Sequence, residues 1–347
     1  MRTPQRPKSE VRKIQLTGGS TYIVSLPKRW VSEHGISPKD QVRVEWRPSG
    51  NLRVMPEAST ILRRRELEID LDKITINFLL DHLIGAYLSG AQLIRIFSKS
   101  GFERKHRKVF RTFIQTTRGI EITTESEKSI EMLSLLNPTE IPLHSSINRM
   151  YLLVSIQIRD ITDVLGGSDS SVLNDSEERE KEIDALRLLM ERQVGQILES
   201  SSLEDSMGIN RWEASEFSKI VRIFERMGDH CLLISNLILE FEGKPITPKS
   251  ALLGVIPLWH KSMKLLISNL RKYKINEVHE AKSKLSDAIK ILEAYESNLW
   301  DQKVGRINAL YRDKISESLR RICAYSMDMS EILINMHNHQ SSFDKIY

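Results

Sequence analysis

Two carboxylates, Glu225 and Asp229, stand four residues apart in a segment over 212–242 that the sequence predicts to be one helix. No proline interrupts the segment, and its apolar residues recur at helical spacing: Ile220, Phe224, Met227, Cys231, Ile234 and Ile238. Residues four apart share one face of a helix, so the carboxylates should lie side by side, away from the apolar stripe. Like charges at this spacing repel each other, and a bound cation would reverse the sign of that interaction.

A second pair, Glu180 and Asp184, repeats the spacing in a predicted helix over 176–198. The pair falls at the edge of that helix's apolar stripe, which consists of Ile183, Leu186, Met190, Val194 and Ile197. Two neighbouring antiparallel helices would bring all four carboxylates together. Clustered carboxylate oxygens suit hard or borderline cations, here Fe, Zn, Mn or Mg in a divalent or trivalent state. The alternative is that both pairs are ordinary charges on solvated helix faces.

The segments Glu180-Lys-Glu-Ile-Asp184-Ala-Leu and Glu225-Arg-Met-Gly-Asp229-His230 resemble the paired E/D-x-x-x-D signature of PhoU proteins. The resemblance covers about residues 146–345. It implies a phosphate-signalling regulator built as two three-helix bundles in tandem, which we expect at 146–250 and 251–347. It also implies that Glu180, Asp184, Glu225 and Asp229 bind metal on the bundle surface.

An internal repeat supports the tandem arrangement. A shift of 99 residues aligns Asp229 with Asp328 and keeps the hydrophobic stripe. The second unit is predicted to contain helices over 257–273, 277–300 and 307–337. Ala324 stands where Glu225 would predict an acid, so Asp328 has no partner at the required spacing. We therefore expect the better metal site in the first unit.

The charge is unevenly distributed along the chain. Residues 1–65 hold 14 Lys and Arg against 5 Asp and Glu, whereas the remaining residues hold 37 against 41. A basic N-terminal region on a mildly acidic remainder suggests that this region meets a polyanion. The two cysteines exclude a disulfide-rich secreted scaffold, and no stretch approaches the length of a membrane helix. We expect a cytoplasmic protein without membrane insertion.

The N-terminal region alternates like a small β domain. Strands are predicted at 12–16, 21–26, 41–46 and 51–55, with a short helix at 28–34 that follows Pro27. This order resembles the SpoVT/AbrB swapped-hairpin domain through Lys13-Ile14, Gly18-Gly19-Ser20, Val24-Ser25-Leu26-Pro27-Lys28-Arg29-Trp30 and Gly35-Ile36-Ser37-Pro38-Lys39-Asp40. The resemblance implies an intertwined dimer over 1–58 that binds DNA or, in some members, a protein. The candidate phosphate contacts are Arg12, Lys13, Lys28 and Arg29.

Residues 59–145 predict a small α/β connector. Strands are expected at 66–70, 92–97, 120–124 and 130–136, and helices at 74–89 and 103–117. The basic run Arg104-Lys105-His106-Arg107-Lys108 is interpreted as the solvated face of a helix that is buried through Val109, Phe110 and Phe113. The whole chain is thus a multidomain protein: an N-terminal swapped-hairpin β-barrel, an α/β connector, and C-terminal all-α tandem three-helix bundles.

These features predict a regulator rather than an enzyme. The sequence has no glycine-rich phosphate loop, no Ser/His/Asp order and no Cys-x-x-Cys motif, and no organic cofactor is expected. The first hypothesis is a phosphate-responsive transcriptional regulator that binds DNA as a homodimer or higher oligomer and controls phosphate uptake. A second is an adaptor that contacts a phosphate transporter or signalling protein without binding DNA. A third is a metal-dependent phosphohydrolase that uses the four carboxylates.

Overall fold

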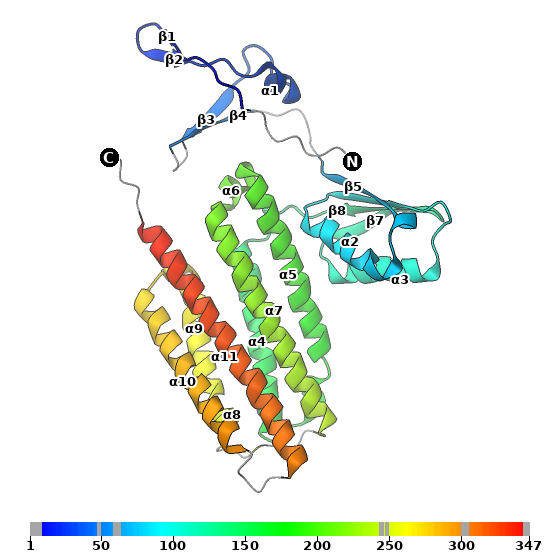
Figure 1. Cartoon of the computed structure of the whole chain (residues 1–347), viewed down its shortest axis with the longest axis vertical. Coiled ribbons are helices and arrows are strands. Elements are labelled where there is room, and N and C mark those ends of the chain that lie inside the picture. Colours follow the sequence, from blue (N-terminus) through cyan, green and yellow to red (C-terminus); the bar gives the residue numbers. More distant parts are fainter. Residues whose placement is uncertain are drawn as a thin grey trace. The chain divides into compact units, whose positions relative to one another are not determined.

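The computed structural model describes residues 9–46, 50–57, 64–242, 246, 250–299 and 305–342 (Figure 1). The chain divides into two compact units, Met1–Arg64 and Arg65–Tyr347, which we call the head and the body. Short strands dominate the head, whereas the body joins an α/β module to a mainly helical region. The predicted fold class is therefore confirmed.

The head consists of two separate hairpins and one short helix. Strands β1 (Gln15–Thr17) and β2 (Thr21–Ile23) pair across a turn in which Gly18 and Gly19 have φ of 63° and 80°, a region that favours glycine. Helix α1 (Lys28–Glu33) follows, and then β3 (Val42–Trp46) pairs with β4 (Leu52–Pro56). Residues 47–49, between these two strands, and the predicted boundary at residue 58 lie outside the described residues.

The connector is a four-stranded sheet with two helices on one face. Its elements, in chain order, are β5 (Glu66–Asp70), a 3-10 turn (Leu71–Lys73), α2 (Ile76–Leu88), β6 (Leu93–Phe97), α3 (Arg104–Thr116), β7 (Ile120–Glu125) and β8 (Ser129–Ser134). The strand order is β5-β6-β8-β7, with β5 and β6 parallel and the other pairs antiparallel. Ile94 and Ile96 point into the core against Phe110 and Phe113 of α3, and all four are buried. Burial of the two phenylalanines confirms the predicted orientation of α3.

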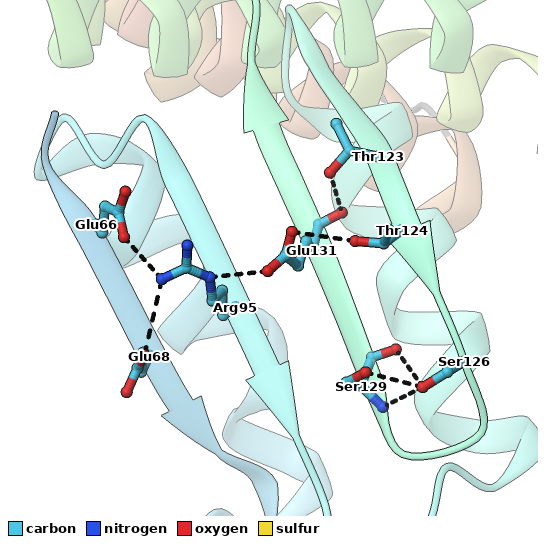
Figure 2. A network of polar contacts seen from close by, with 8 residues as sticks. All are labelled: Glu66, Glu68, Arg95, Thr123, Thr124, Ser126, Ser129 and Glu131. Carbon is cyan, nitrogen blue, oxygen red and sulfur yellow. Dashed lines mark hydrogen bonds and ion pairs between the residues drawn. The ribbon is translucent and has the colours of Figure 1, made fainter.

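The opposite face of the sheet is polar. Arg95 of β6 forms ion pairs with Glu66 of β5 at 2.7 Å and with Glu131 of β8 at 2.8 Å (Figure 2). One guanidinium therefore ties the central strand to both of its neighbours, because β6 lies between β5 and β8.

Two three-helix units follow the connector. Their elements are α4 (Leu143–Leu165), a 3-10 turn (Ser170–Leu173), α5 (Ser176–Glu199), α6 (Ser201–Met207), α7 (Arg211–Glu240), α8 (Ala251–Gly254), α9 (Ile256–Lys272), α10 (Ile275–Leu299) and α11 (Arg306–Ser341). The long helices α4, α5 and α7 make the first unit, and α9, α10 and α11 make the second (Figure 1). One continuous apolar cluster runs through both units. Trp300, the predicted last residue of α10, lies outside the described residues.

Local sequence explains why the long helices begin where they do. Asn210 and Glu213 form a capping box at the start of α7, with the Asn210 side chain accepting from the Glu213 amide at 2.9 Å. Pro257 occupies the first turn of α9, where a missing amide hydrogen does not weaken the helix. Within the described ranges, no helix combines the length and apolar character that a membrane span needs.

A buried arginine joins the connector to the first three-helix unit. Arg192 of α5 is only 3% exposed, and its guanidinium donates to the carbonyl oxygens of Tyr87 and Ala91. The same group lies 4.8 Å from the centre of the Tyr87 ring. Gly195, one turn further along α5, allows close approach, since a Cβ there would lie 3.4 Å from the Leu88 carbonyl oxygen. The connector is therefore fixed to α5 by both polar and packing contacts.

Candidate functional site

The interface between α5 and α7 is where the structure places the predicted acid pairs. All apolar positions named above on both helices are buried, so the two stripes form the common core. Gly228 of α7 faces Ile183 of α5, and a Cβ there would lie 3.0 Å from the Ile183 Cδ1 atom. The helices are antiparallel: Arg187 of α5 pairs with Glu225 of α7, and Glu191, further along α5, pairs with Arg222, which comes earlier on α7. We call this line of contact the α5–α7 seam.

The four predicted carboxylates come together along this seam. Glu180 and Asp184 of α5 and Glu225 of α7 are half-buried, and Asp229 of α7 lies at the exposed edge. Burial, then the neighbouring charges of Asp184 and Asp229, raise the pKa of Glu180 to about 7. Burial is the main cause of this rise, and the other carboxylates along the seam add to it.

The two acids of α7 show the same effect. Burial raises the pKa of Glu225, and the nearby carboxylates of Asp229 and Asp184 act in the same direction. Burial also raises the pKa of Asp229, again with a contribution from Asp184. Glu180, Glu225 and Asp229 therefore each have a pKa that is raised in part by another carboxylate of the set.

Arg187 is the residue that sequence reasoning missed. Its guanidinium lies 3.6 Å from Asp184, 3.5 Å from Glu225 and 3.3 Å from Glu191, and its side chain is 22% exposed. The positive charge of Arg187 opposes the rise in the pKa of both Glu225 and Asp229. A signal was present, since Arg187 is three residues beyond Asp184 and therefore shares its helical face.

A further ion pair closes the seam beyond Arg187. Arg222 of α7 lies 2.9 Å from Glu191 of α5. Negative and positive side chains therefore alternate from Glu225 through Arg187 and Glu191 to Arg222. The acidic excess is thereby confined to the end that holds Glu180 and Asp229.

The donor chemistry of the seam fits a hard cation, because all four candidate ligands supply carboxylate oxygens. The four carboxylates lie near one another but do not form a coordination shell. Across the described residues, no three His, Cys, Asp or Glu side chains are grouped closely enough to hold an ion. Arg187 contributes to this arrangement, because its guanidinium forms ion pairs with Asp184 and Glu225 where a metal ion would otherwise bind them. Metal binding at Glu180, Asp184, Glu225 and Asp229 stays a prediction.

The corresponding seam of the second unit, between α10 and α11, is crossed by two ion pairs. Lys282 of α10 meets Glu331 of α11 at 2.8 Å, and Arg320 of α11 meets Glu296 of α10 at 3.2 Å. Burial raises the pKa of Asp328, with a further contribution from Glu331. The side chain of Ala324 supplies no ligand, so the two units differ in charge although they share a fold.

The predicted DNA contacts lie on exposed parts of the head. Arg12 and Lys13 precede β1, and Lys28 and Arg29 form the first turn of α1. All four are exposed. Arg12 pairs with Glu10, and Arg29 pairs with Glu33 at 2.7 Å. Exposed pairs of this kind contribute little and are readily exchanged for other anions.

Comparison with known proteins gives a family match within the head and another within the body. Residues 147–238 match the PhoU domain, and residues 15–62 match the domain described as "Antidote-toxin recognition MazE, bacterial antitoxin". The first match spans α4 to α7 and includes all four carboxylates; the second includes Lys28 and Arg29 but begins after Arg12 and Lys13. Searches of curated proteins and of solved structures gave no match.

These matches place two domains of known families in one chain. The chain carries a MazE/AbrB-like domain at its N-terminus and a PhoU domain in its helical region, which confirms the predicted combination. Both are regulatory rather than catalytic domains, and together they relate the chain to phosphate signalling.

Proposed function

We propose that this protein is a dimeric, phosphate-responsive transcriptional regulator that controls phosphate uptake. The head binds DNA, and the helical body binds a metal ion or a partner that reports phosphate status. The observation that carries the proposal is the joining of the two matched regulatory domains in one chain with a strongly basic head.

Dimerisation of the head is supported by its lack of a core. Within the described part of Met1–Arg64, no residue is buried. Large apolar side chains are instead exposed, namely Val11, Ile14, Leu16, Tyr22, Ile23, Val24, Val44, Trp46 and Leu52. An exposed apolar surface of this extent marks an interaction site, and two-stranded hairpins are not stable alone. A second copy that exchanges hairpins would supply the missing core and cover the strand edges.

DNA binding is supported by the charge and exposure of Arg12, Lys13, Lys28 and Arg29. Cations at such sites bind phosphates and release counterions, which makes affinity fall steeply with salt. The direct experiment is recovery of genomic DNA by the purified full-length protein, followed by sequencing of the bound fragments. Enrichment of discrete sites near phosphate-uptake genes is expected. Recovery of no DNA at low salt would contradict the proposal.

Metal binding by the body is supported by the four carboxylates of the α5–α7 seam. Fe, Zn, Mn or Mg would be held by Glu180, Asp184, Glu225 and Asp229, and the ion would neutralise the charges that raise the pKa of Glu180. These four side chains would offer the ion oxygen ligands only, three of them from half-buried positions and Asp229 from an exposed one.

A second candidate function is that of an adaptor without DNA binding. The description of the matched N-terminal domain names recognition of a protein, and the exposed apolar residues of the head could serve such a contact. In this case the basic head would bind a protein partner while the body meets a phosphate transporter or signalling protein. Salt-dependent DNA binding separates the two functions, because only the first requires phosphate contacts.

A further inference from the structure

Helix α3 of the connector carries an unusual concentration of positive charge. It holds five Arg and Lys and no Asp or Glu. Arg107 pairs with Glu125 of β7, and Lys105 lies 3.1 Å from Glu103. The other three, Arg104, Lys108 and Arg111, are exposed and have no ion-pair partner in the part of the chain that the structure describes. We call these three residues the α3 stripe.

The α3 stripe lies along one side of the helix. Its members are spaced by four and three residues, which places them on one face over two turns. At 1.5 Å per residue they cover about 10 Å of helix axis. One strand of DNA carries a phosphate every 3.4 Å along the duplex axis, so about three phosphates fall within that length.

The charge of α3 opposes the stability of the helix. The first turn is the positive end of the helix dipole and favours acidic residues, whereas α3 has Arg104 and Lys105 there. The acidic N-cap Glu103, which forms a capping box with His106, offsets part of this cost.

The residues around the α3 stripe indicate which class of partner it could bind. The apolar face of α3 is buried through Phe110 and Phe113, so it is not available for insertion into a lipid surface. The helix itself contributes no acidic side chain, and Arg104 lies at the positive end of its dipole. A backbone of regularly spaced phosphates matches this arrangement, because it needs charge and spacing but no apolar contact.

We propose that the α3 stripe is a second DNA-backbone contact, located in the connector and separate from the head. The inference rests on the proposed DNA binding and deepens it. Contacts of this kind carry no base specificity, so the stripe adds affinity for any duplex and leaves the choice of operator to the head.

The test compares four full-length proteins on a 30-base-pair duplex of random sequence at several salt concentrations. They are the parent, the variant R104A/K108A/R111A, the head variant R12A/K13A/K28A/R29A, and the control K264A/K272A/R321A. The control removes the same number of exposed cations from α9 and α11. We expect the α3 variant to lower the slope of log affinity against log salt by about 2 to 3, at about 0.9 for each phosphate that it no longer neutralises. The control should leave the slope unchanged.

Thermal melting of the same four proteins shows whether a loss of DNA affinity comes from a loss of folded protein. Because the α3 variant removes Arg104 from the positive end of the helix and places alanine, the strongest helix former, at all three positions, its melting temperature should equal or exceed that of the parent. A loss of DNA affinity in a protein of unimpaired stability supports the stripe.

An unchanged slope in the α3 variant, or an equal loss in the control, would overturn the inference. If the head variant still loses affinity, the proposed function survives that result. A parent that binds no duplex would remove both proposals. Binding to poly-glutamate that disappears in the α3 variant, together with an unchanged DNA slope, would assign the stripe to an acidic protein instead.

Discussion

The Nε atom of Arg187 on α5 lies 3.5 Å from the Oε1 atom of Glu225 on α7. This pair links the two helices at the point where four carboxylates gather, and the same guanidinium also lies 3.6 Å from Asp184. The protein therefore supplies one cation of its own to the α5–α7 seam. An added metal ion would meet a set of ligands that Arg187 already neutralises in part.

Replacing Arg187 should separate these two roles. In Arg187→Gln the carboxylates lose their tethered cation, so the metal-free protein should lose about 1–3 kcal/mol of unfolding free energy. Its rise in melting temperature on addition of Mn²⁺ should exceed that of the parent, because the metal then relieves more repulsion. Arg149→Gln is the matched control, since Arg149 forms an exposed pair with Glu182 that should contribute less than about 1 kcal/mol. A Mn²⁺ effect in Arg187→Gln no larger than the parent's would contradict this role.

The two three-helix units should differ in metal content. Asp229→Ala removes a ligand from a complete set of carboxylates, whereas Asp328→Ala removes one from a seam where Ala324 supplies none. We therefore expect Asp229→Ala to lose much of the bound metal and of the metal-dependent stabilisation, and Asp328→Ala to lose much less. Elemental analysis after identical purification measures the difference. Equal metal in Asp229→Ala and the parent would mean that the acid pairs are solvated charges.

The raised pKa of Glu180 predicts a pH dependence of stability in the metal-free protein. The folded pKa of about 7 lies above the ordinary value of 4.5, so between these pH values the folded state keeps a proton that the unfolded state has released. Stability should fall as pH rises through this window, by an amount on the order of 1 kcal/mol once solvent screening is allowed for. In Glu180→Gln this decrease should be largely absent. Urea unfolding of both proteins at pH 5 and pH 8 in the presence of a chelator tests this prediction. The quantity compared is the change in unfolding free energy between the two pH values. The prediction is contradicted if the parent is more stable at pH 8, unless Glu180→Gln gains even more stability over the same range.

The Arg192 contact should hold the connector to the bundle. Arg192→Leu keeps apolar bulk but leaves the carbonyl oxygens of Tyr87 and Ala91 without their donors, so we expect a loss of about 2–4 kcal/mol. Arg192→Lys keeps a charge and one donor group and should lose less. Denaturant unfolding followed by both tryptophan fluorescence and circular dichroism measures the loss. A midpoint equal to the parent's would show that the joint depends on packing alone.

The helical region was the most predictable part of the chain. The helix predicted over 176–198 is observed as Ser176–Glu199, and that predicted over 212–242 as Arg211–Glu240. Long amphipathic segments with polar capping residues leave few alternatives, because their apolar stripe specifies both the helix and the face it buries. The connector strands were also located, since β5 is observed at the predicted residues 66–70.

Two properties could not be obtained from the sequence. The approach of Arg187 to Glu225 depends on the register between two helices, and spacing within one helix does not define that register. The head presents the opposite difficulty: its strands follow the predicted alternation, yet none of its described residues is buried in a single copy. Its alternating pattern identifies strands, and under the proposed dimerisation a second copy of the chain covers their apolar side chains.

The central claim is that the head binds DNA through Arg12, Lys13, Lys28 and Arg29. The most direct measurement is the salt dependence of DNA affinity for the full-length parent and the variant R12A/K13A/K28A/R29A on the same duplex. The account predicts weaker binding and a slope reduced by about 0.9 for each phosphate that the four side chains neutralise in the parent. A variant that binds with unchanged affinity and an unchanged slope would contradict it.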